Sequence, residues 1–189
     1  MRRVAGLGLV LVLGCTGAET ASPDAGAAPA TFIAQTSHFQ AFRTWEVVDL
    51  GPVEPLLDGG LRDEDGGLRG DPHGNGGNKR VYINAPPAGG GTLFPVGTII
   101  VKAVEHATPQ EWEIHAMVKR GGDYNRAGAV GWEWFDLAVD VSDRVAIVWR
   151  GLGNDTYGGL HRAEDAVDCN ACHVLAAAHD HVFTQALWP

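Results

Sequence analysis

Two cysteines and a histidine near the C-terminus have the spacing of a covalent haem-attachment site. They form the sequence CNACH, in which Cys169 and Cys172 are three positions apart and His173 follows at once. The two thiols are able to add to the two vinyl groups on one edge of a haem, and the histidine then lies under the iron as its proximal ligand. The motif therefore predicts one covalent haem c per chain, with His173 as the metal ligand.

Two other interpretations of this cysteine pair fit the chain less well. A thioredoxin-like CxxC is expected near the start of a βαβ unit, whereas Cys169 lies after a long series of strand patterns. A structural zinc site needs more ligands at suitable spacing, and the sequence holds no second cysteine pair. We therefore expect haem, and we expect the nearby His179 and His181 to be surface or packing residues.

The N-terminus has the features of a lipoprotein export signal. Arg2 and Arg3 precede an apolar and glycine run over residues 4–14, which is too short to span a bilayer as a helix. The run ends in VLGC, which resembles a lipobox in which Cys15 becomes the lipidated first residue. Ordinary secretion is the alternative. We expect residues 1–14 to be a signal peptide and the protein to lie in the bacterial cell envelope, lipid-anchored in the periplasm or at the outer membrane.

The cysteine count and the charge agree with this location. The chain has 3 cysteines, so one lipid-bound and two haem-bound cysteines leave none for a disulfide. The formal net charge is −9, and removal of the signal peptide with its two arginines makes the chain more acidic. Such a charge disfavours nucleic acid and anionic lipid surfaces as partners, and it suits a basic redox partner protein.

Strand patterns fill the middle of the chain. Small residues and proline dominate residues 15–36, which indicates a flexible tether after the lipidated cysteine. Residues 37–189 fit one haem domain, which opens with a short helix near His38 and an extended segment. Five runs rich in β-branched and aromatic residues predict an antiparallel sheet of about five strands; they cover residues 80–85, 97–105, 111–120, 131–139 and 144–151.

The segments around these strands complete the predicted fold. The Asp- and Gly-rich residues 58–71 lack the ligand spacing of a calcium loop, so we expect a solvated loop there. The C-terminal segment is rich in alanine, leucine and histidine, and it predicts one or two helices that carry the haem motif. The expected fold class is therefore α+β, an antiparallel sheet with an N-terminal helix and C-terminal helices.

Two strands carry candidates for the distal side of the haem. Period-two alternation puts Glu113, His115, Met117 and Lys119 on one face of their strand. Either His115 or Met117 could face the iron, or this face could be solvated; Glu113 is not counted among the site residues. Lys102 interrupts a strand that is apolar on both faces, so it needs a partner or a function unless its side chain snorkels to the sheet edge.

In order and spacing, these segments resemble the cytochrome P-460 and cytochrome c′-beta family of small β-rich c-type haem proteins. The resemblance covers about residues 45–183 and rests on RVYIN, FPVGTIIVK, IHAMVK, GWEWF and DCNACH with DHVFT after it. It implies a homodimer with an open distal site. It also implies that Lys102 matches the lysine that P-460 proteins bond to the haem ring, and that His115 stands in place of their proton-accepting glutamate.

Three functions follow from this resemblance. The first is oxidation of hydroxylamine or nitric oxide at a five-coordinate, lysine-modified haem, with His115 relaying protons. The second is binding of nitric oxide or carbon monoxide without catalysis, in the manner of cytochrome c′-beta. The third is electron transfer by a six-coordinate haem bound through His173 and either His115 or Met117. We expect the first of these functions. The protein is an enzyme only if Lys102 modifies the haem and His115 relays protons.

Overall fold

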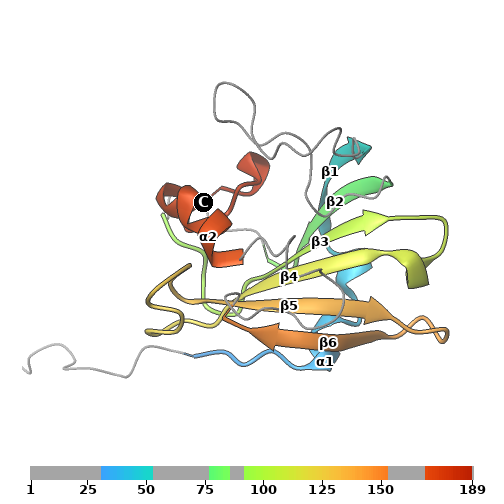
Figure 1. The fold of residues 1–189 in the computed structure, drawn as a ribbon, viewed down its shortest axis with the longest axis horizontal. Coiled ribbons are helices and arrows are strands. Elements are labelled where there is room, and N and C mark those ends of the chain that lie inside the picture. Colours follow the sequence, from blue (N-terminus) through green and yellow to red (C-terminus); the bar gives the residue numbers. More distant parts are fainter. Residues whose placement is uncertain (1–30, 53–76, 86–91, 153–168, 189) are drawn as a thin grey trace, which may run out of the picture.

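The computed structural model describes residues 31–52, 77–85, 92–152 and 169–188. They form an antiparallel sheet of six strands in sequential order (Figure 1). The chain is thus α+β, as expected. The strands are β1 Glu46–Pro52, β2 Asn78–Ile83, β3 Ile99–Glu105, β4 Glu113–Lys119, β5 Trp132–Val139 and β6 Val145–Gly151.

The sheet has six strands where the sequence predicted about five. The additional strand is β1, which pairs with β2 at the edge of the sheet. Its side chains are exposed or half-buried along its whole length, so it lacks the buried alternation that identifies the other strands. A bulge between Asp49 and Gly51 interrupts the pairing, and Gly51 has a left-handed φ of 80°. Bulges and polar residues are common on edge strands, where they limit pairing with other chains.

The N-terminal segment covers one face of the sheet. The helix α1 Thr36–Phe39 and the 3-10 turn η1 Phe42–Thr44 bury Phe39 and Phe42 completely. Their rings lie 5.3 Å from Phe135 and 5.2 Å from Tyr82, measured between centroids. Aromatic burial of this kind is among the largest contributions to a small core.

Part of the segment predicted to be a flexible tether, residues 15–36, packs against the sheet. Ala34 is fully buried in the core beneath the sheet. The backbone N–H of Phe32 donates to the carbonyl of Arg120 over 2.9 Å. The predicted tether therefore ends earlier than residue 36, because Phe32 and Ala34 have apolar side chains whose burial is favourable. The predicted signal peptide, Cys15 and the loop over residues 58–71 lie outside the described residues.

The C-terminal segment covers the opposite face (red in Figure 1). It comprises α2 Cys169–His173 and the 3-10 turns η3 Val174–His179 and η4 Gln185–Leu187, with a further turn, η2 Pro109–Glu111, before β4. Val182 and Leu187 pack in one apolar cluster with Trp132 and Trp134 of β5. Within the described ranges, no helix is long and apolar enough to cross a membrane.

Candidate functional site

His173 lies between two aromatic rings at the end of α2. Its centroid is 4.5 Å from the Trp134 ring and 5.1 Å from the Phe183 ring. Its Nδ1 atom is 2.6 Å from the carbonyl oxygen of His181. Because a carbonyl only accepts, Nδ1 carries the proton and Nε2 keeps the lone pair that binds a metal. Metal-bound histidines commonly have such a second hydrogen bond, which fixes the ring orientation.

The His173 ring is electrically neutral at pH 7. Its pKa is lowered to about 4, chiefly by burial and in smaller part by the positive charges of Lys102 and His181, while the hydrogen bond to the His181 backbone opposes the shift. A neutral imidazole is the form that ligates iron. The ring therefore has the protonation state and the tautomer that a metal ligand would need.

A buried ion pair anchors the turn that supplies the His181 carbonyl. Lys119 Nζ lies 2.6 Å from Asp180 Oδ1, and these side chains are only 9% and 3% exposed. The second oxygen of Asp180 accepts the Phe94 N–H over 2.9 Å. Asp180 and His181 both have left-handed φ values, 50° and 68°, which residues with a side chain rarely adopt. Lys119 on β4 thus holds this turn against the sheet.

Cys169 and Cys172 lie on the same short helix as His173. Both are half-buried, and Cys169 packs partly against the apolar cluster formed around Trp132 and Trp134. The chain thus has a neutral, oriented imidazole, two thiols within one helical turn of it and an apolar, aromatic surrounding. These are features that a covalently attached haem requires, so the residues fit the group.

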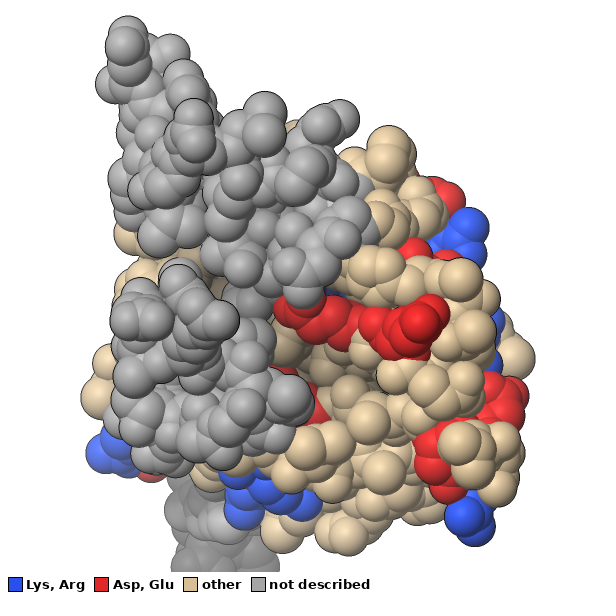
Figure 2. Space-filling model, turned by 45° about the vertical axis from the view of Figure 1, so that its right-hand side comes forward, with Lys and Arg blue, Asp and Glu red and all other residues tan. Residues whose placement is uncertain are grey.

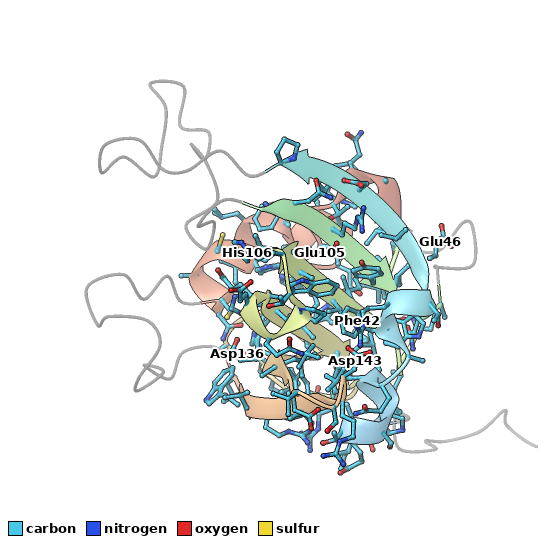
Figure 3. All side chains as sticks on the ribbon, turned by 90° about the vertical axis from the view of Figure 1, so that its right-hand side faces the viewer. Phe42, Glu46, Glu105, His106, Asp136 and Asp143 are labelled. Atoms are coloured by element: carbon cyan, nitrogen blue, oxygen red, sulfur yellow. The ribbon has the colours of Figure 1, made fainter. Side chains whose placement is uncertain are left out.

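Strand pairing brings the distal candidates together. Lys102 on β3 is directly opposite His115 on β4, and His115 is opposite Asp136 on β5. Opposite side chains on one face of a sheet have Cβ atoms about 4.5–5.5 Å apart. This is the face toward the C-terminal helices: Figure 3 shows Asp136 on that side and Phe42 on the other. The charge of Lys102 lowers the pKa of both His115 and His173, which indicates that Lys102 is near both.

Two carboxylates hold His115. Its Nδ1 atom is 2.6 Å from Asp136 Oδ1 and its Nε2 atom is 2.7 Å from Glu113 Oε1. Burial is the largest single influence on the His115 pKa and lowers it, but the hydrogen bonds to Asp136 and Glu113 together raise it above the ordinary 6.5. A carboxylate only accepts, so both ring nitrogens carry protons and His115 has no lone pair for iron in this arrangement.

The second distal candidate, Met117, is a core residue in this structure. It is buried in the apolar cluster, opposite Ile100 on β3 and Trp134 on β5. Its thioether is thus enclosed by apolar side chains. The structure therefore confirms that His115 and Met117 lie on one face of β4, and it gives neither of them the environment of an iron ligand.

Sequence reasoning missed two residues of this site. Glu113 was not counted, yet it contacts His115, and the alternation of β4 was the signal that could have included it. Asp136 had no such signal, since only the pairing of β4 with β5 places it beside His115. The other histidines behave as expected: His181 is buried, and the ring of His179 stacks on Trp188 at 3.4 Å between centroids.

Comparisons with known proteins identify no relative of this chain. No protein family, curated protein or solved structure matches it. A functional assignment therefore depends on the residues and the geometry of the site.

The two carboxylates predict how His115 titrates. We expect a midpoint above 6.5 by histidine-selective NMR, with the His115 signal assigned from His115→Gln. Asp136→Asn should lower this midpoint because it removes the anionic acceptor at Nδ1. Since the pKa is higher in the folded chain than in the unfolded chain, protonated His115 stabilises the fold below pH 6.5, and this stabilisation is lost as the pH rises through the folded pKa.

The matched control for this titration is Asp143→Asn. Asp143 lies away from the site and pairs with Arg43, so its loss should leave the His115 midpoint unchanged (Figure 3). An equal midpoint in the wild type and in Asp136→Asn would contradict the hydrogen-bonded arrangement.

Proposed function

We propose that the protein is a lipid-anchored c-type haem protein that oxidises a small nitrogen compound, hydroxylamine or nitric oxide. The observation that supports this most is the hydrogen bond from His173 Nδ1 to the His181 carbonyl, because it leaves Nε2 as a ligand atom on the short helix that also carries the two thiols. Cys169, Cys172 and His173 would hold the haem. When bound, the haem supplies the iron that takes up the substrate and the route by which its electrons leave.

The chain's own residues provide acid–base groups on the face toward α2. His115, protonated between Asp136 and Glu113, is able to donate a proton from one ring nitrogen and regain one at the other. A histidine with this role replaces the glutamate of the P-460 pattern. Lys102, directly opposite His115, is the residue that we propose to bond covalently to the haem ring.

The second candidate function is binding of nitric oxide or carbon monoxide without catalysis. It is favoured by the same open distal side, since His115 is protonated at both nitrogens and Met117 is packed in the core. It differs from the first function in that Lys102 forms no bond to the haem.

We also propose a homodimer in the cell envelope that passes electrons to a redox partner protein. The acidic composition favours a basic partner. In Figure 2, acidic side chains form a short strip near the middle of the face in view, and such a strip also favours a basic partner. Attraction of this kind raises the rate of association more than the affinity.

The absorption spectrum of Lys102→Ala decides between the two functions. We expect the ferrous, haem-loaded wild type to have a strongly red-shifted Soret band, and the variant to have an ordinary c-type band, because the lysine bond changes the electronics of the ring. The intact mass of both denatured chains checks that haem is attached to each. Lys79→Ala, which removes a lysine from the neighbouring strand β2, is the matched control and should keep the red-shifted band.

The outcomes separate the proposals. A red-shifted band lost only in Lys102→Ala makes hydroxylamine turnover the next assay. An ordinary high-spin c-type spectrum in every variant would rule out the lysine bond and leave gas binding. A low-spin spectrum in the wild type would instead show that a sixth ligand closes the iron.

A further inference from the structure

Asn170, one of the two residues between the cysteines of the haem motif, is buried and joins α2 to the sheet. Only 8% of the residue is exposed to solvent. The Nδ2 atom donates to the Leu152 carbonyl over 2.5 Å and to Asn125 Oδ1 over 3.1 Å. The Oδ1 atom accepts three N–H groups, which belong to the Asn125 side chain at 2.8 Å, the Ala129 backbone at 3.1 Å and the Trp134 indole at 3.1 Å.

The connection between β4 and β5 is shaped to receive this side chain. A Cβ atom added at Gly128 would lie 2.3 Å from Asn170 Cγ, closer than any real contact. Gly128 therefore leaves the space that Asn170 fills. A buried amide is stable only when its donors and acceptors are paired, and this position pairs both ends of it.

Two connections lead from Asn170 to His173. Asn170 precedes His173 by three residues in α2, so the two side chains lie on neighbouring positions of one helical face. In addition, the indole that donates to Asn170 belongs to Trp134, whose ring is 4.5 Å from the His173 ring. Fixing Asn170 therefore fixes both the helix that carries His173 and one of the rings that confine it.

We propose that Asn170 is a positioning residue, which sets the orientation of the His173 imidazole toward the iron by holding α2 and the Trp134 indole. This inference rests on the proposed haem attachment. Residues that contact a metal-bound histidine fix the orientation of its ring and tune the metal. A displaced Trp134 indole would therefore change the iron–histidine bond. The residue between the cysteines thus has a role of its own in the site.

The test measures the iron–histidine bond in the haem-loaded protein. We expect Asn170→Ala to shift or broaden the Fe–His stretching band in resonance Raman spectra of the ferrous form, and to change the midpoint potential. Trp134→Phe keeps an aromatic ring beside His173 but removes the indole donor, and it should shift the same band in the same direction.

The matched control is Asn84→Ala, which removes an asparagine that bonds the Ile99 N–H and the Gly97 carbonyl away from α2. It should lower the melting temperature and leave the band and the potential unchanged. If the wild type takes up haem, and if Asn170→Ala and Trp134→Phe both keep its Fe–His band and midpoint potential, the positioning role alone is overturned. A wild type that takes up no covalent haem would overturn the proposed function, and this inference with it. If Asn170→Ala fails to fold, Trp134→Phe alone decides.

Discussion

Asp180→Asn is expected to lower the free energy of unfolding by about 3–5 kcal/mol, because it leaves Lys119 as a buried charge without its counter-ion. The Lys119–Asp180 pair is 2.6 Å long and nearly inaccessible to water, so solvent cannot replace the lost carboxylate. The turn that carries the His181 carbonyl should loosen as well, and His173 should lose its hydrogen-bond partner. Urea denaturation measures the stability, and the Fe–His stretching band measures the second effect.

A double variant and a surface pair test this explanation. Lys119→Met combined with Asp180→Asn should recover most of the lost stability, because it removes the uncompensated charge. Asp123→Asn breaks the ion pair with Arg126, whose side chains are 73% and 71% exposed, and should cost less than about 1 kcal/mol. Equal losses in Asp180→Asn and Asp123→Asn would show that burial of the pair contributes nothing.

Glu133→Gln should have an effect of similar size on the opposite face of the sheet. The carboxylate of Glu133 is 3% exposed and accepts two hydrogen bonds from Arg150, at 2.9 Å and 2.8 Å, and one from Arg120 at 3.2 Å. The same Arg150 guanidinium donates to the Ala34 carbonyl over 2.9 Å, so the network also holds the N-terminal segment. Removing this carboxylate from between two guanidinium groups should cost about 3–5 kcal/mol.

The location of Glu133 separates stability from function. It lies on the face away from α2, so the Soret band and the Fe–His band of folded Glu133→Gln should match the wild type. Asp140→Asn, which weakens a partly exposed pair with Arg144, is the matched control and should cost less than about 1 kcal/mol. A changed haem spectrum in Glu133→Gln would show that the two faces of the sheet are coupled.

Local residue patterns determined much of this protein. Alternation and β-branched composition identified β2 to β6, since a buried strand has a period of two that a short stretch of sequence displays. CNACH identified the proposed attachment residues, because the spacing of two thiols and a histidine is itself the chemical requirement. The alternation of β4 also placed His115 and Met117 on one face, where the structure has them. β1 was read only as an extended segment, since an edge strand buries too little to show a period.

The tertiary structure alone decided which atoms meet in the site. The His181 carbonyl reaches His173 only through a left-handed turn held by a lysine 61 residues away along the chain. Asp136 reaches His115 only because of the register between β4 and β5, and a shift of one residue would move it to the other face. Asn170 looked like a spacer between cysteines, and its partners come from segments up to 45 residues away. Such contacts depend on how strands pair and helices dock, which spacing along one segment does not encode.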